Sequence, residues 1–138
     1  MDLQVNQVIP QRYPFEMIDY FNDVKPGVSA TATKLITIDE WFFHNQPVDH
    51  LAVPRPLMIE AMAQTGVAAI LSMDEYKGKN VFFGGIRQAK FQADFKPGDK
   101  LTLSVKLEKL RRNIGLGHGT ITREGKEICD ADLIFAIE

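Results

Sequence analysis

The segment from Leu57 to Ser72 limits the possible folds more than any other part of this sequence. Its sixteen residues are mostly Leu, Met, Ile, Ala and Val, and Ala strongly favours helix. Because apolar residues surround the whole helix, it must be buried in the protein or span a membrane. It is shorter than the roughly 18–20 apolar residues that a span needs, and it contains Glu60 and Gln64. The pattern therefore predicts a helix buried inside a folded domain and no membrane span.

The segments that follow this helix have the patterns of β-strands. Apolar and polar residues alternate from Leu101 to Glu108 and again over residues 129–137, which is typical of a sheet with one solvated face. Asn80 to Phe95 is a longer stretch interrupted by Gly84-Gly85, where we expect a β-bulge. Glu124-Gly125 indicates a hairpin turn. An antiparallel sheet with one apolar face buries that face by curling around the helix, so the predicted class is α+β.

Composition narrows the function classes. A chain of 138 residues fits a single domain covering residues 1–138, and a net charge of -2 provides no broad basic field for nucleic acid. The single cysteine, Cys129, lies on the apolar face of a predicted strand, so we expect it to pack in the core of a protein from a reducing compartment. The first residues have no signal-peptide pattern, and a cytoplasmic location is expected. The sequence implies neither a metal nor an organic cofactor.

Three segments resemble the 3-hydroxyacyl-acyl carrier protein dehydratases of fatty acid synthesis. They are residues 9–15 with Asp19 (IPQRYPF…D), residues 59–64 (IEAMAQ), and residues 83–99, which contain FGGI, KF and PGD. The resemblance implies a hotdog fold, an antiparallel β-sheet wrapped around one long central helix. It also implies an acyl thioester of acyl carrier protein or coenzyme A as the substrate, and a homodimer or trimer of dimers as the assembly. Exposed edges of such a sheet favour edge-to-edge dimerisation.

The resemblance also implies the chemistry of the site. In this family, a histidine from the loop before the helix faces a glutamate on the helix across the dimer interface, and the pair removes water from a 3-hydroxyacyl thioester. One group takes the proton next to the thioester carbonyl while the other helps the hydroxyl to leave. Glu60 matches the family glutamate, and burying a carboxylate in an apolar helix without a function is costly. We therefore expect Glu60 to be catalytic.

The sequence departs from the family at the histidine. An alignment without gaps from Phe42 to Glu60 places Gln46 at that position, and an amide has no proton to give or take at physiological pH. His44, two residues earlier, is an alternative acid or base. His50 matches a second histidine of the family pattern, for which a supporting role is favoured. Arg55 replaces a family glycine, and its side chain is a candidate contact for a ligand phosphate or carboxylate.

Other residues are candidates for substrate binding. Phe43, Phe83 and Gly84 are expected to line an acyl tunnel, although aromatic residues at such spacing are also typical of an ordinary core. Arg111 and Arg112 lie where the family has a basic run, and they are candidate contacts for the acidic carrier protein or its pantetheine phosphate. The alternative is a solvated strand end.

Three functions remain open at this point. The first is a hydro-lyase that dehydrates 3-hydroxyacyl thioesters with Glu60 at its centre. The second is a thioesterase, because neighbouring hotdog enzymes pair a helix carboxylate with a loop amide, as Glu60 and Gln46 would. The third is a noncatalytic subunit that binds acyl chains or the carrier protein.

Overall fold

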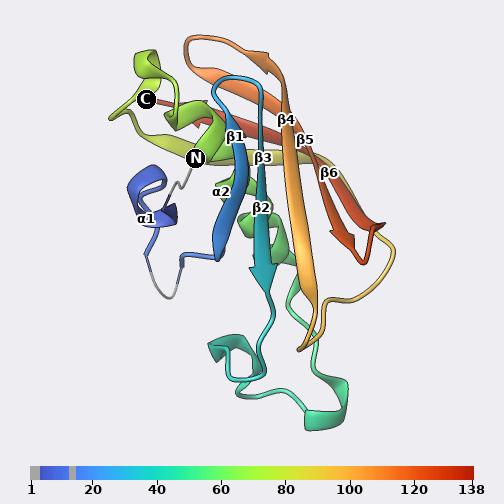
Figure 1. Ribbon diagram of the computed structural model, residues 1–138. Coiled ribbons are helices and arrows are strands. Elements are labelled where there is room, and N and C mark those ends of the chain that lie inside the picture. Colours follow the sequence, from blue (N-terminus) through green and yellow to red (C-terminus); the bar gives the residue numbers. More distant parts are fainter. Residues whose placement is uncertain (1–3, 13–14) are drawn as a thin grey trace.

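The computed structural model describes residues 4–12 and 15–138, so Tyr13 and Pro14 of the first family-like segment lie outside the described residues. Figure 1 shows one sheet with a long helix packed against it. The sheet has six antiparallel strands in the order β1-β2-β4-β5-β6-β3. The strands are β1 (Tyr20–Lys25), β2 (Ser29–Leu35), β3 (Val81–Phe91), β4 (Lys100–Leu110), β5 (Ile114–Arg123) and β6 (Lys126–Ile137). The predicted α+β arrangement is confirmed.

The helices are α1 (Val5–Val8), α2 (Arg55–Leu71) and the short 3₁₀ turns η1 (Trp41–Phe43), η2 (Val48–His50) and η3 (Asp74–Tyr76). The predicted central helix is α2, which begins two residues earlier than expected because Pro54 and Pro56 can stand at the first turn, where no backbone N–H needs an intrahelical acceptor. Within the described residues, none of the helices has both the length and the apolar character to cross a bilayer.

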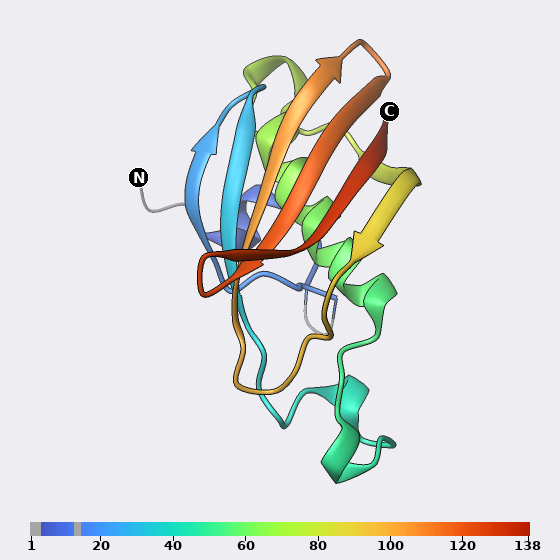
Figure 2. The ribbon, with the colours of Figure 1, turned by 90° about the vertical axis from the view of Figure 1, so that its right-hand side faces the viewer.

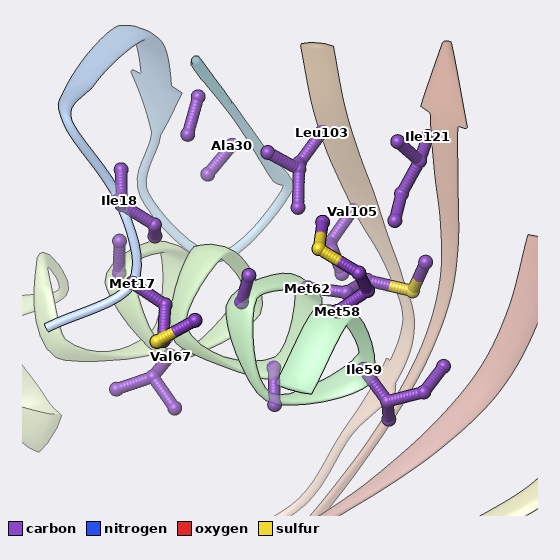
Figure 3. Close-up of a cluster of buried hydrophobic side chains, with 14 of the residues drawn as sticks. Met17, Ile18, Ala30, Met58, Ile59, Met62, Val67, Leu103, Val105 and Ile121 are labelled. Atoms are coloured by element: carbon purple, nitrogen blue, oxygen red, sulfur yellow. The ribbon is translucent and has the colours of Figure 1, made fainter. Parts of the chain in front are cut away.

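The core lies between α2 and the inner face of the sheet. Figure 3 shows Met58 and Met62 of α2 in this space, facing Leu103, Val105 and Ile121 of the strands. The helix approaches the sheet closely at Gly66, where an added Cβ would lie 2.5 Å from Cζ of Phe135. Because of this contact and similar ones, every residue from Ala61 to Ile70 is buried. The helix is apolar on all sides because the sheet covers one side and residues 15–18 cover part of the other.

Two predicted local features are confirmed. The pairing of β3 with β6 changes register between Phe83 and Gly85, so the Gly-Gly pair forms a bulge. Glu124 and Gly125 both have positive φ angles, 53° and 78°, as the two central residues of a type I′ hairpin turn require.

Cys129 is fully buried, and this burial raises the pKa of its thiol to about 12, as expected for a residue that packs rather than reacts.

Candidate active site

Glu60 stands in the second turn of α2, at the boundary between the open start of the helix and its covered part. Arg55 and Pro56 are exposed, Leu57 and Glu60 are half-buried, and all residues from Ala61 to Ile70 are buried. The carboxylate is thus less buried than the apolar sequence around it suggested, although Met58 and Ile59 just before it are buried on the covered side of the helix.

The carboxylate is held by Gln64, one turn further along α2. Gln64 Nε2 donates to Glu60 Oε1 at 3.1 Å and to the Phe15 carbonyl at 2.6 Å, while Gln64 Oε1 accepts from the Met17 N–H at 2.8 Å. The Met17 N–H can only donate, so it fixes which end of the amide is the oxygen. The amide therefore always directs a donor toward Glu60. Gln64 itself is 1% exposed.

The role of Gln64 was missed by reasoning from the sequence, which treated it only as part of the helix signature. The signal that could have found it is the spacing, because residues four apart on a helix lie side by side. A polar residue inside an apolar helix also needs partners when it is buried.

Gln64→Met is expected to lower the free energy of unfolding by about 1–3 kcal/mol, because it leaves the buried Met17 N–H without its acceptor. Urea unfolding measures this change. The matched control is Gln7→Met at an exposed position. An unchanged midpoint would contradict the assigned role of Gln64 as the link between α2 and the N-terminal segment.

Gln46 is tied into its own loop. Its Nε2 donates to the Phe42 carbonyl at 2.9 Å, and its Oε1 accepts from the Ala52 N–H, also at 2.9 Å. Its amide therefore joins the two ends of the segment that contains η1 and η2. No hydrogen bond within the described residues joins Gln46 to Glu60. Figures 1 and 2 show that this segment extends away from the body of the domain beyond the start of α2, whereas Glu60 lies within the helix.

The three histidines occupy different environments. His44, directly after η1, and His50, at the end of η2, are both exposed, and His50 Nε2 lies 3.6 Å from Asp49 Oδ2. Their loop is the same projecting segment that carries Gln46. His118 lies in the middle of β5 on the outer face of the sheet, away from α2. Only His44 and His50 therefore share a segment with the predicted site.

Arg55 is the first residue of α2, and its side chain has partners at the end of β3 and in the connection after it. The guanidinium lies 4.9 Å from the centre of the Phe91 ring, and Nη2 lies 3.4 Å from Asp94 Oδ1. Its side chain is 51% exposed, so these contacts leave much of the guanidinium open to solvent. The arrangement supports the start of α2 and keeps a positive charge beside it.

The predicted tunnel residues lie on two separate elements. Phe43 is buried in η1, where its ring packs at 67° against that of Phe42 with the ring centres 4.7 Å apart. Phe83 is half-buried and Gly84 exposed on β3, at one edge of the sheet. An added Cβ at Gly84 would lie 3.2 Å from the Ile134 carbonyl oxygen, so close strand pairing explains this glycine.

Arg111 and Arg112 lie at the end of α2 that is farther from Glu60. They line a cleft of about 440 Å³ together with Gly27, Met73, Glu75, Tyr76, Lys79 and Leu110. The hydroxyl of Tyr76, just after α2, donates to the Arg111 carbonyl at 3.1 Å. Glu60 and the last residue of α2 are eleven positions apart, or roughly 16 Å along the helix axis. Within one chain, the structure does not bring these arginines to the acid.

Comparison with known proteins identifies the family. The model of the FabA-like domain family matches residues 9–132. The chain belongs to the FabA-like family. Over 134 residues it is 44% identical to a protein of Ligilactobacillus salivarius named 3-hydroxyacyl-[acyl-carrier-protein] dehydratase FabZ, covering 97% of this chain and 96% of the relative. A protein of the same name from Oenococcus oeni is 41% identical, and the match covers 98% of this chain and 97% of that relative.

Solved structures place this FabA-like chain among hotdog folds. The Dehydratase Heterocomplex ApeI:P from Xenorhabdus doucetiae matches with a TM-score of 0.82 and 20% identity, covering 99% of this chain and 91% of the other. A hypothetical thioesterase with coenzyme A from Streptococcus pneumoniae matches with a TM-score of 0.65 and 12% identity, covering 86% of this chain and 84% of the other. At such identities, these two matches establish the fold alone. The expected hotdog fold and the resemblance to the dehydratases are confirmed.

Proposed function

We propose that this chain, acting as a single hotdog domain, is a dehydratase-like hydro-lyase for 3-hydroxyacyl thioesters of acyl carrier protein or coenzyme A. The observation that carries the proposal is the Glu60 carboxylate, which Gln64 holds at the open start of an otherwise apolar helix. An oriented carboxylate beside apolar surface suits a ligand with a reactive polar end and a hydrocarbon chain. The names of the curated relatives support the same substrate class.

In the proposed reaction, Glu60 takes the proton from the carbon next to the thioester carbonyl. The electrons of that C–H bond form the double bond, the C–O bond of the hydroxyl breaks, and the same proton leaves with the hydroxyl as water. One carboxylate is thus both base and acid, because Gln46 has no titrating proton. An amide NH₂ group has two N–H bonds, and the bond to Phe42 uses only one. The second is available to the substrate.

The test is to incubate the protein with 3-hydroxyacyl and saturated acyl thioesters of both carriers and to follow the enoyl product and free thiol. Enoyl formation supports the proposal. Release of thiol without enoyl product would contradict it and would favour a thioesterase in which Gln46 and Glu60 position water.

A noncatalytic subunit that binds acyl chains or carrier protein is a second candidate. One observation favours it, which is that both ends of the Gln46 amide are engaged inside the loop. Such a subunit would bind a 3-hydroxyacyl thioester and release neither product, and isothermal titration calorimetry on the same preparation would identify it.

We further propose that the chain acts as a homodimer or trimer of dimers in the cytoplasm, joined through β3. This strand is at one end of the sheet and exposes Phe82 and Ile86, at 51% and 44%. An apolar edge strand is a ready site for pairing with another strand. Light scattering after size exclusion is expected to give at least twice the 15.6 kDa of one chain. A monomer at micromolar concentration would contradict this assembly.

Arg111 and Arg112 are proposed to bind the acidic carrier protein in such an assembly. The substrate on that carrier protein would then reach Glu60 of another protomer. Reversing both charges (Arg111→Glu, Arg112→Glu) is expected to weaken carrier binding, with the largest difference at low salt because exposed charges are screened by ions. Calorimetry at two salt concentrations measures the effect. Lys126→Glu, at an exposed position in the β5–β6 hairpin, is the control. Unchanged affinity of the double variant would contradict this role.

A further inference from the structure

Three potential metal ligands meet on the outer face of the sheet. Glu108 comes from β4, His118 from β5 and Asp132 from β6, and one ligand atom of each lies within 4.8 Å of the others. His118 and Asp132 are directly paired across neighbouring strands. In Figure 2 the sheet lies in front of α2, so this outer face points toward the viewer. The cluster therefore lies on the side of the sheet opposite the helix that carries Glu60.

The geometry of the cluster suits a metal ion. His118 Nδ1 and Asp132 Oδ1 are 2.8 Å apart. In a tetrahedral site with ligand bonds of about 2.0–2.2 Å, two ligand atoms are roughly 3.3–3.6 Å apart, so this hydrogen-bonded pair must open by less than about 1 Å to hold an ion between its atoms. The ladder of β5 and β6 fixes the backbones of His118 and Asp132, whereas Glu108 lies at the irregularity of β4 between Leu107 and Lys109, where its exposed side chain can turn toward the ion.

The local charge also favours a cation. The hydrogen bond that His118 donates to Asp132, together with the negative charges of Asp132, Asp130 and Glu108, raises the pKa of His118 despite its partial burial. The same carboxylates attract a divalent ion. Lys106 of β4, which pairs with His118 of β5, opposes this attraction by its positive charge, and so does Lys25 at the side of the neighbouring groove.

That groove has a volume of about 400 Å³, and it borders the cluster at His118. His118 and Asp132 side chains are 40% and 41% exposed, so an ion bound between them keeps contact with water. Three protein ligands with open positions for water are a common arrangement for borderline ions. One imidazole and two carboxylates fit Zn²⁺ or Co²⁺ better than Mg²⁺ or Ca²⁺, which prefer oxygen ligands alone.

We propose that Glu108, His118 and Asp132 form a surface site for a divalent transition-metal ion such as Zn²⁺ or Co²⁺, which links the three central strands β4, β5 and β6. The site is separate from the acyl-thioester chemistry proposed for Glu60.

The test is a titration of the tag-free full-length protein with Co²⁺, followed by its visible absorption, and with Zn²⁺, followed by calorimetry. One ion per chain is expected. Loss of an outer-shell partner alone typically costs about 10- to 100-fold in metal affinity, so His118→Ala and Asp132→Asn, which remove ligands, should each cost at least about tenfold. Because a metal ligand must be unprotonated, binding should also strengthen as the pH rises through the pKa of His118.

The matched control is His50→Ala, since His50 also lies beside a carboxylate, Asp49, on an exposed part of the chain. It should keep the wild-type affinity. Circular dichroism of each variant checks that the fold is retained. The proposal is overturned if millimolar Co²⁺ or Zn²⁺ does not bind, if His118→Ala binds as tightly as wild type, or if His50→Ala alone removes binding. None of these results depends on whether the protein dehydrates thioesters.

Discussion

Replacing Gln46 by histidine (Gln46→His) is expected to raise the rate of 3-hydroxyacyl thioester dehydration by about 10²- to 10⁴-fold, which is what one positioned general acid or base typically contributes. An imidazole titrates near neutral pH, whereas the amide of Gln46 does not. One ring nitrogen can keep one of the two loop links, by accepting from the Ala52 N–H or donating to the Phe42 carbonyl, and the other nitrogen is left to exchange a proton with the substrate. The rate is measured from the absorbance of the enoyl thioester.

Asn45→His is the matched control, since it places an imidazole at the adjacent exposed position. It should leave the rate near that of the unmodified chain. If Gln46→His folds normally but gains no activity, then Gln46 does not occupy the position of the family histidine, and the alignment that placed it there is wrong.

Glu60→Gln is expected to lower dehydration by about 10²- to 10⁴-fold, because Glu60 is proposed to move the proton. The substituted amide oxygen still accepts from Gln64 Nε2, so the structure of α2 should be retained. Thioester affinity should change little, which separates a catalytic loss from a binding loss. Steady-state kinetics and calorimetry with the same substrate measure the two quantities. Activity that survives in Glu60→Gln would eliminate the proposed mechanism.

The control for this variant is Glu75→Gln, which removes an exposed carboxylate from the arginine-lined cleft and leaves α2 intact. A mixing experiment then locates the site. The Gln46→His, Glu60→Gln double variant has the histidine but lacks Glu60, whereas the wild-type chain has Glu60 but lacks the histidine. If residues 46 and 60 meet across two protomers, co-refolding the two chains should produce the faster, histidine-assisted activity. An absence of this gain would place both groups in one chain.

Several features followed from sequence patterns because they depend on neighbouring residues. The central helix was predicted from its apolar composition; its end moved by one residue and its start by two, since prolines are accepted in a first turn. The Glu124-Gly125 turn and the Gly84-Gly85 bulge were located because backbone conformation is decided locally by glycine and by the neighbouring strands. The family resemblance was carried by such local segments, and the comparisons confirmed it.

Tertiary structure decided the environment of each functional group. The sequence identified Glu60, and the four-residue spacing places Gln64 beside it, but only packing oriented the Gln64 amide, because its other partners are residues 15 and 17, more than forty positions away. The same applies to the internal bonds of Gln46 and to the distance between Arg111 and Glu60. The Glu108, His118 and Asp132 cluster has no sequence motif, because it exists only through the pairing of three strands. Sequence determined the elements and the acid, whereas contacts between distant segments determined what that acid can do.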